Sequence, residues 1–435
     1  MLQDLRALQV RFEQLGVREI LCKQLAENDN SKQQVYLGGN FDVLQMLPFE
    51  NIESCLGGKK PNYKARLQFY WLDASGQPHQ APHTQLILYP QYPEVRLSGF
   101  LQGCKFAPNE LMRPIPGESR QYNNGPDGRL LFLGVALDRK IHAFLAPASS
   151  LITAEFLANN EKGKFQTQGV FKLIQASTTD TRILLLKSLR EIHVAGWHAS
   201  IRLNSQGLAI PYLAKNGGGY TLEALLGIIP NGRSEPDFMG WEIKGHSSDR
   251  ITLMTPEPDA GFYGEHGVQA FVRRFGRPTG NDTLYFTGLH KVGQRNATTG
   301  LTLMLDGYNP VKRVITHVSG AVHLLTDNGV PAATWTFEKL LAKWNRKHAQ
   351  AAYVSYESNG SSSPEFHYKS PVHLGQGTDF IRYLEALHHG AVVYDPASKV
   401  TDESTKSPKT KARSQFRISF SKLARMYKDF SSYDL

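Results

Sequence analysis

Hydrophobic and polar residues alternate over short stretches in the first third of the chain. Leu2, Leu5, Leu8 and Phe12 have helical spacing and predict a first helix that ends near Gly16. Strand-like runs separated by turn residues follow at residues 19–25, 35–37, 64–72, 85–89, 94–97, 130–137 and 140–144. Many short strands at this spacing predict a mostly antiparallel β-domain, a barrel or a sandwich, over residues 1–155.

The pattern changes after this region. Residues 159–164 are polar and include a glycine, and residues 176–180 supply turn and helix N-cap residues, so we expect a linker over residues 156–178. From Thr181 onward, amphipathic helices interleave with apolar strands. Residues 179–435 are therefore predicted to form an α/β domain with a mixed sheet.

The stretch from residue 219 to residue 246 contains the candidate chemistry. Residues 238–243 predict a short strand, which places Glu242 and Lys244 on one face about 7 Å apart. Asp237 precedes this strand, and Glu223 lies in one or two predicted helical turns that end at a glycine. All four side chains can therefore converge on one place.

These residue types suit hydrolysis of a phosphodiester. Mg²⁺ prefers carboxylate oxygens, water and phosphate as ligands. A lysine beside the carboxylates can position or deprotonate the attacking water and stabilise charge that develops on the phosphate. An acid and a lysine two positions apart on a strand are by themselves typical of a solvated face. The upstream Glu223 and Asp237 favour a functional site instead.

Composition and charge narrow the class of protein. Hydrophobic residues make up 41% of the 435 residues and charged residues 20%, which is typical of a soluble globular protein. No apolar run is long enough to span a membrane, and the N-terminus has no signal-peptide pattern. The three widely spaced cysteines indicate thiols in a reducing cytoplasm. The net charge is +10, and residues 399–435 carry nine Lys and Arg against four Asp and Glu, which favours a polyanionic partner.

In order and spacing, Glu223, Asp237, Glu242 and Lys244 resemble the active-site pattern of the MvaI/BcnI restriction endonucleases, relatives of the mismatch-repair nicking enzyme MutH. The resemblance covers roughly residues 180–430. It implies a restriction-endonuclease-like PD-(D/E)xK fold, Asp237 and Glu242 as Mg²⁺ ligands, Lys244 as the catalytic lysine, and Glu223 as an acid that orients a ligand or water. It also implies a prokaryotic cytoplasmic enzyme that acts on double-stranded DNA, as a monomer.

The tail extends this resemblance to DNA recognition. Residues 416–418, Phe-Arg-Ile, match the end of a family segment that enters the major groove. Arg413, Arg417 and Lys411 are accordingly expected to contact guanine or phosphate. The family's acid-x-Arg reader is not reproduced, because Asp395 is followed by proline and no arginine stands near it in the sequence. The family's sites suggest a short G·C-rich target such as CCWGG.

The N-terminal part resembles the opening of the EcoRII N-terminal pseudobarrel DNA-binding domain, through residues 23–25 and the polar loop that follows. Asn28, Asp29, Lys32 and Arg96 would then approach the major groove. An unrelated β-domain with a similar loop is the alternative interpretation.

Together these features predict a sequence-specific, Mg²⁺-dependent restriction endonuclease whose N-terminal domain reads DNA, and which can hold a second DNA copy. Two other interpretations stay open. One is a modification-dependent endonuclease whose N-terminal domain reads an altered base. The other is a DNA-binding protein without catalysis, in which the acid cluster is structural.

Overall fold

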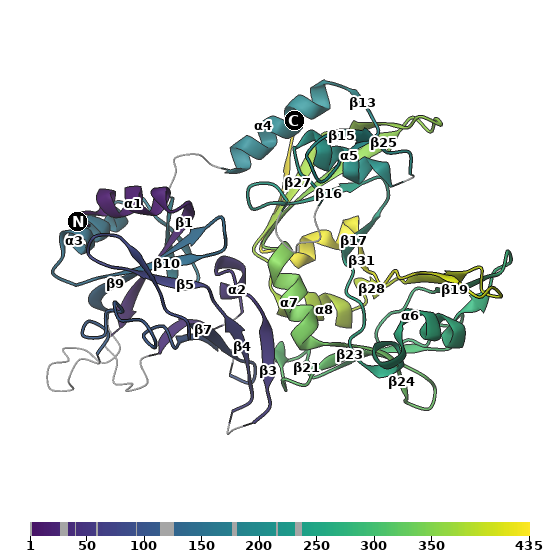
Figure 1. Cartoon of the computed structure of the whole chain (residues 1–435), viewed down its shortest axis with the longest axis horizontal. Helices are drawn as coiled ribbons and strands as arrows, with labels where there is room; N and C mark the ends of the chain where they lie inside the picture. Colours follow the sequence, from purple (N-terminus) through teal and green to yellow (C-terminus); the bar gives the residue numbers. More distant parts are fainter. Residues whose placement is uncertain are drawn as a thin grey trace. The chain divides into compact units, whose positions relative to one another are not determined.

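The chain forms two compact units, Met1–Thr178 (the N-terminal unit) and Thr179–Leu435 (the C-terminal unit). The structure is a computed structural model, and it describes residues 2–26, 34–39, 41–57, 60–92, 94–113, 126–175, 181–214, 216–230 and 237–435 (Figure 1). No helix among these residues has the length and apolar character needed to cross a membrane.

The N-terminal unit is mostly β, as predicted. One sheet has the strand order β11-β12-β1-β9-β10-β5-β6, and a second has the order β2-β8-β7-β4-β3. Pairing is antiparallel except between β10 and β5. The elements are α1 (Leu5–Gln14), β1 (Val17–Ala26), β2 (Val35–Gly38), α2 (Val43–Met46), β3 (Ile52–Cys55), β4 (Asn62–Arg66), β5 (Phe69–Leu72), β6 (Pro78–Gln80), β7 (Gln85–Tyr89), β8 (Glu94–Ser98), β9 (Pro126–Ala136), β10 (Ile141–Ala146), α3 (Leu151–Glu161), β11 (Gln166–Gln168) and β12 (Phe171–Gln175).

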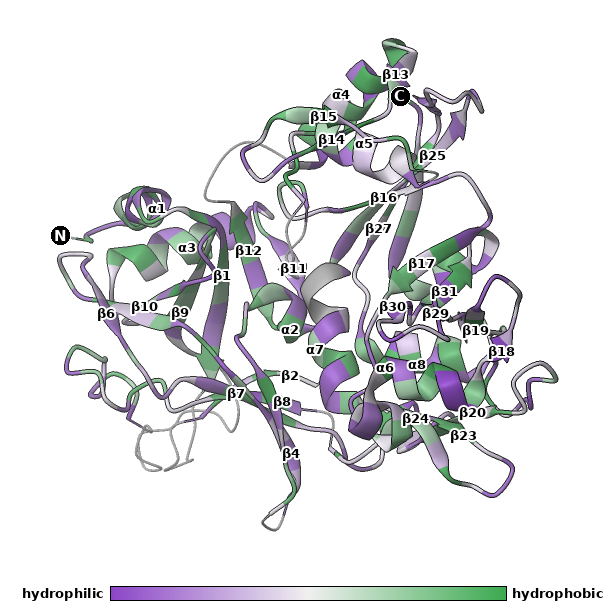
Figure 2. Ribbon diagram, turned by 45° about the vertical axis from the view of Figure 1, so that its right-hand side comes forward, coloured by the Kyte–Doolittle hydropathy of each residue, from purple (hydrophilic) through white to green (hydrophobic). Residues whose placement is uncertain are grey.

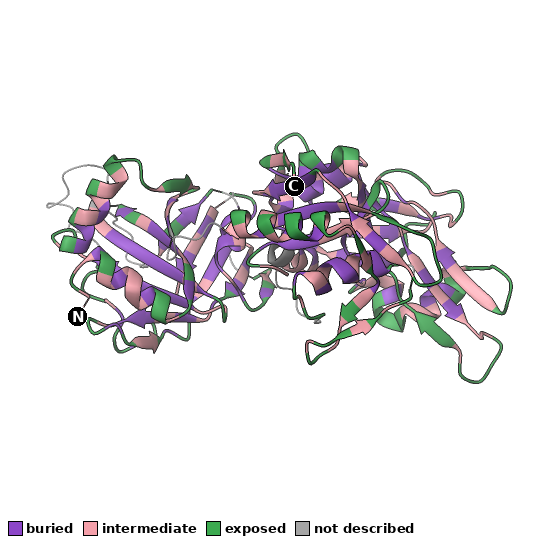
Figure 3. Cartoon of the chain, turned by 90° about the horizontal axis from the view of Figure 1, so that it is seen from above, coloured by how far each residue is buried: buried purple, intermediate pink, exposed green. Residues whose placement is uncertain are grey.

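Helices α1 and α3 cover one face of the first sheet (Figure 1). The predicted stripe of α1 is buried at Leu5, Leu8 and Phe12, and Asp4 caps the helix by accepting a hydrogen bond from the backbone N–H of Ala7. Burying each of these apolar side chains contributes roughly 1.5–3 kcal/mol. Figure 3 shows such buried positions along the strands and exposed positions on the outer surfaces of the helices.

Residues 156–175, which were predicted to lie in a linker, belong instead to the N-terminal unit. They complete α3 and form β11 and β12, and β12 pairs with β1 in the first sheet. Phe156, Phe171 and Ile174 are almost fully buried. The polar residues 159–164 form the end of α3 and the turn that leads to β11, so their composition marks a connection within the unit.

The C-terminal unit contains a mixed sheet flanked by helices, which confirms the predicted α/β class. Its elements are α4 (Thr181–Val194), β13 (Trp197–Ala199), β14 (Ile201–Leu203), β15 (Ala209–Pro211), α5 (Gly217–Leu225), β16 (Glu242–His246), β17 (Arg250–Met254), α6 (Gly261–Phe275), β18 (Arg277–Pro278), β19 (Thr283–Thr287), β20 (Thr302–Asp306), β21 (Tyr308–Asn309), β22 (Val314–Ile315), β23 (Ala321–Leu325), β24 (Pro331–Thr336), α7 (Phe337–Lys347), β25 (Gln350–Ser358), β26 (Glu365–Tyr368), β27 (Val372–Gln376), α8 (Phe380–His388), β28 (Val392–Tyr394), β29 (Ala397–Thr401), β30 (Lys409–Lys411), β31 (Phe416–Ser419), η2 (Phe420–Met426) and β32 (Asp429–Tyr433).

The central sheet has the order β13-β26-β25-β27-β32, and β16 pairs in parallel with β25. Helices α4 and α5 pack on one face of it, where Leu185, Leu189 and Leu222 meet Ile243 and Val354. Smaller sheets complete the unit, with the orders β17-β31-β28, β18-β19-β29-β30 and β20-β23-β24. The face of the central sheet opposite α4 and α5 receives the alternate side chains of β16.

Candidate active site

A tight turn places Asp237 beside β16. The backbone N–H of Phe238 donates to the carbonyl of Trp241 at 2.9 Å, and that of Trp241 donates back at 2.8 Å. Met239 (φ 48°) and Gly240 (φ 91°) both have positive φ, as a two-residue hairpin turn requires. The expectation of one continuous strand over residues 238–243 is therefore wrong, because the chain reverses there and β16 begins at Glu242. The reversal brings Asp237 opposite Glu242.

Asp237 is held to β16 by a hydrogen bond. Its Oδ2 accepts from the backbone N–H of Ile243 at 3.1 Å. Trp241 and Ile243 are buried in the core under α4 and α5. Because side chains alternate along a strand, Glu242 and Lys244 project from the opposite face. The apolar partners of Trp241 and Ile243 thus fix which way the two charged side chains point.

Glu242 and Lys244 form a close ion pair. Lys244 Nζ lies 2.6 Å from Glu242 Oε1, and the side chains of Glu242 and Lys244 are 2% and 22% exposed. Burial alone would lower the pKa of Lys244, but the negative charges of Glu242, Asp237 and Glu223 more than compensate and raise it. The negative charges of all three carboxylates therefore act on Lys244. A buried charged cluster of this kind is typical of a functional site.

Helix α5, which carries Glu223, lies close to the sheet beside β16. A side-chain carbon on Gly218 would stand 2.3 Å from the ring of Tyr356, so only glycine allows this approach. The hydroxyl of Tyr368 donates to the carbonyl of Gly218 at 2.7 Å and fixes the same contact. The glycines at the start of α5 thus have a packing role.

Tyr353 is a site neighbour that sequence reasoning missed. It is the register partner of Lys244 on β25, so both side chains project from the same face. Its hydroxyl lies 2.6 Å from the hydroxyl of Tyr427, and both residues are buried. Burial raises the pKa of Tyr353 well above its ordinary value, so this phenol stays neutral. Only the strand register could have indicated this residue.

The donor set fits a hard divalent cation. Asp237 and Glu242 supply carboxylate oxygens on facing backbone positions, and Lys244 Nζ donates to Oε1 of Glu242. Within the described ranges, no group of three or more His, Cys, Asp and Glu could hold a metal alone. Mg²⁺ commonly takes one or two carboxylates and completes its shell with water and substrate phosphate, so a carboxylate pair is a fitting site.

A second acid–base cluster surrounds Asp395. Arg417 Nη1 donates to Asp395 Oδ2 at 2.9 Å, Arg417 Nη2 donates to the backbone carbonyl of Arg250 at 2.9 Å, and Arg250 Nη1 lies 3.6 Å from Asp395 Oδ2. Although no arginine is near Asp395 in the sequence, two arginines lie beside it in space. The arginines arrive from β31 and β17, which pair with each other.

The other candidate DNA contacts have different surroundings. Lys411 and Arg413 are exposed, and the backbone N–H of Arg413 donates to the hydroxyl of Ser398 at 2.9 Å. In the N-terminal unit, Arg96 on β8 pairs with Glu94 at 3.0 Å and donates to Gln34 at 3.2 Å. The predicted contacts Asn28, Asp29 and Lys32 lie outside the residues that the structure describes.

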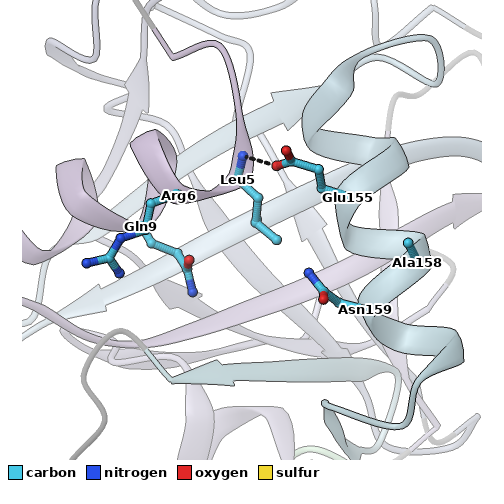
Figure 4. Close-up of a pocket in the computed structure, with 6 residues that line it drawn as sticks. All are labelled: Leu5, Arg6, Gln9, Glu155, Ala158 and Asn159. Carbon is cyan, nitrogen blue, oxygen red and sulfur yellow. Dashed lines mark hydrogen bonds between the residues drawn. The ribbon is translucent and has the colours of Figure 1, made fainter.

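A hollow in the N-terminal unit lies between α1 and α3 and contains none of the predicted site residues (Figure 4). The carboxylate of Glu155 accepts there from the backbone N–H of Leu5 at 2.9 Å, so this acid caps the start of α1. The hollow is lined by Leu5, Arg6, Gln9, Glu155, Ala158 and Asn159.

Comparison with known proteins bears on the C-terminal unit. The model of the MvaI/BcnI restriction endonuclease family matches residues 186–427. Two solved structures, restriction endonuclease MvaI with cognate DNA substrate and MvaI without DNA, are 19% and 16% identical to the chain, with TM-scores of 0.45 and 0.33. Both cover 59% of this chain, and 99% and 98% of their own. No curated protein matches the chain. The family match spans both the Lys244 cluster and the Asp395 cluster.

Proposed function

Because the chain belongs to the MvaI/BcnI restriction endonuclease family, we propose that this DNA-cleaving enzyme is a type II restriction endonuclease whose catalytic centre is Glu223, Asp237, Glu242 and Lys244. The observation that carries this proposal is the buried ion pair of Lys244 with Glu242 at 2.6 Å, beside the carboxylate of Asp237. A half-buried ammonium that contacts one carboxylate and is acted on by the charges of two more matches the needs of phosphodiester hydrolysis.

Each residue has a separate task in this proposal. Restriction endonucleases generally use divalent metal ions, and Asp237 and Glu242 would hold Mg²⁺. When bound, Mg²⁺ supplies positive charge at the phosphate and acidifies a coordinated water. Lys244 places its ammonium where negative charge develops on the phosphate during the reaction. Glu223, half-buried on α5, orients water or a ligand from the helix side.

Asp395 and Arg417 are proposed to read a G·C base pair. Their mutual ion pair, together with the Arg250 carbonyl, fixes the guanidinium plane before DNA arrives. A fixed guanidinium can donate to O6 and N7 of guanine, and a carboxylate can accept from N4 of cytosine. Arg413 and Lys411 would contact a base or phosphate nearby. A short G·C-rich target such as CCWGG fits this reader.

The N-terminal unit is proposed to bind DNA as well. Arg96 stands on β8 with a polar neighbour from the edge of the same sheet, and its side chain is 32% exposed. Through this unit the monomer would engage its target or a second copy of it. If the unit instead reads an altered base, the enzyme is modification-dependent.

Cleavage of supercoiled DNA tests the proposal. Purified full-length protein is incubated with unmethylated or methylated plasmid, with Mg²⁺ or with chelator, and the products are sequenced at their ends. We expect Mg²⁺-dependent cutting of unmethylated DNA at one short sequence. Cutting confined to methylated DNA would favour modification dependence. Absence of cutting on every DNA, with binding retained, would mean that the acid cluster is structural.

A further inference from the structure

Three basic side chains lie in one row across the sheet β18-β19-β29-β30. The register pairs Arg277 with Tyr285, Tyr285 with Lys399, and Lys399 with Lys411. Register partners on neighbouring strands project from the same face of a sheet. Figure 2 shows these four strands side by side, although β19 and β29 are more than a hundred residues apart in the chain. We call Arg277, Tyr285, Lys399 and Lys411 the basic row.

The basic row is on the outer face of this sheet. The alternate positions Phe286, Ser398 and Val400 are buried, and α6 packs against β19 and β29. Arg277 and Lys411 are exposed, and Tyr285 and Lys399 are half-buried. The row spans three strand spacings, about 14 Å. One DNA strand presents a phosphate for roughly every 3.4 Å of helix axis, so several phosphates fit along this length.

The cations of the row have no acidic counterpart, in contrast to their neighbours. Lys409 pairs with Asp402 at 3.2 Å, and Arg273 pairs with Glu403 at 2.8 Å. Within the described part of the chain, no carboxylate lies within ion-pair distance of Arg277, Lys399 or Lys411. Three aligned positive charges without a carboxylate partner among the described residues are complementary to a polyanion of regular spacing.

The row is continuous with the proposed base reader. The backbone N–H of Asp395 donates to the carbonyl of Gln415 at 2.8 Å, and that of Ala397 donates to the carbonyl of Arg413 at 2.9 Å. The segment that leads from β28 into β29 is thus hydrogen-bonded to the segment between β30 and β31. A duplex read at Asp395 and Arg417 would therefore extend toward a surface that carries uncompensated positive charge.

We propose that the basic row binds the DNA backbone beside the base-reading pair, with Arg277 and Lys399 as phosphate contacts. This inference rests on the proposed function and adds two residues, from β18 and β29, that no motif indicates. Phosphate contacts fix the register of the protein on the duplex without reading sequence. The row thus positions the DNA, and Asp395 and Arg417 select the bases.

The test is the salt dependence of binding by the full chain. Double replacement Arg277→Ala with Lys399→Ala should lower the slope of log K against log salt by about 1.8, because each phosphate contact contributes about 0.9. The loss of affinity should be the same for target and random duplexes at matched salt. The charge-preserving pair Arg277→Lys with Lys399→Arg should restore the slope.

A matched control removes the same charges elsewhere. Lys187 and Arg190 are exposed on α4, which packs against the opposite face of the central sheet from Lys244. Replacing both by alanine lowers the net charge by the same amount and should leave the slope at the wild-type value. An unchanged slope in the Arg277 and Lys399 variant, or a loss confined to one sequence, would overturn the inference. An error in the proposed function would be recognised separately, because the wild-type protein would then not cleave DNA.

Discussion

The ion pairs Glu242–Lys244 and Asp395–Arg417 have similar lengths, 2.6 Å and 2.9 Å, but different surroundings. The Glu242 side chain is 2% exposed, whereas that of Asp395 is 20% exposed. Two further carboxylates act on Lys244, so its pair belongs to a cluster with excess negative charge. Asp395 instead faces two arginines, so its cluster has excess positive charge.

This difference separates two tasks. An excess of carboxylates around one lysine favours a cation and therefore suits the chemistry of hydrolysis. A guanidinium fixed by one carboxylate and one carbonyl retains donors that can point at a base edge, which suits recognition. Substitutions in the Glu242–Lys244 pair should abolish cleavage and leave DNA binding intact. Substitutions in the Asp395–Arg417 pair should change DNA binding.

The largest expected effect is on catalysis. Glu242→Gln, which keeps the side-chain shape, and Lys244→Ala should each lower the cleavage rate about 10²–10⁴-fold, the range for a positioned catalytic group. Single-turnover cleavage with Mg²⁺ measures the rate, and binding without Mg²⁺ checks that the duplex is still held. Lys187→Ala on α4 is the control. Wild-type rates in either variant would remove that residue from the site.

Arg417→Ala should weaken binding of the target by about 1–3 kcal/mol and relax the preference at one base pair, as loss of a bidentate guanine contact does. Binding to duplexes with each base pair substituted in turn measures both effects. Arg413→Ala provides the comparison, because Arg413 is exposed and makes no ion pair among the described residues. A uniform loss across all sequences would make Arg417 a phosphate contact and remove the contrast between the two pairs.

The two pairs also differ in how far the sequence predicts them. Glu242 and Lys244 are two positions apart on one strand, so alternation alone places them on one face. Arg417 meets Asp395 only because β31 pairs with both β17 and β28, and such register between distant segments has no local signature. The separation of 22 residues along the chain hid the pair from a search for an acid-x-Arg motif.

Local propensity failed elsewhere for related reasons. Met239 adopts a positive φ, which is uncommon for a residue with a side chain, so the turn before β16 was expected to be a strand. Strand β12 was expected to be linker because its partner β1 lies about 150 residues earlier. The interleaving of helices and strands in the C-terminal unit was predicted correctly, since it depends on periodicity alone.

Mildly acidic pH should lower the stability of the fold next to the Asp395–Arg417 ion pair. His290 is fully buried and exchanges backbone hydrogen bonds of 2.8 Å and 3.0 Å with Tyr394, which precedes Asp395. Burial lowers the pKa of His290 to about 4, although hydrogen bonds to the backbone of Tyr394 and Gly288 partly oppose this. The unfolded chain, with an ordinary pKa of about 6.5, binds this proton first.

The sign of the pH dependence follows. As the pH falls from about 6.5 toward 4, the unfolded state gains a proton that the folded state refuses, so stability declines across this window. At pH 5.5 this effect lowers the free energy of unfolding by about 1 kcal/mol. Denaturant unfolding at pH 8 and at pH 5.5 measures it, and His290→Gln should reduce the difference between the two by that amount. An equal difference in both proteins would contradict the assignment to His290.

The smallest effect is expected from replacing Arg250. This variant distinguishes the roles of the two arginines around Asp395. The guanidinium of Arg250 lies 3.6 Å from Asp395 and its side chain is 53% exposed, whereas its backbone carbonyl accepts from Arg417 at 2.9 Å. Arg250→Ala keeps that carbonyl and removes only an exposed ion pair, so the free energy of unfolding should change by about 0.2–1 kcal/mol. The change should shrink at high salt, because exposed pairs are screened. Target binding, measured in the same buffer as for Arg417→Ala, should change far less than in that variant. A loss of target affinity as large as that of Arg417→Ala would assign a base contact to Arg250 itself, and the reader would then consist of two arginines on one carboxylate.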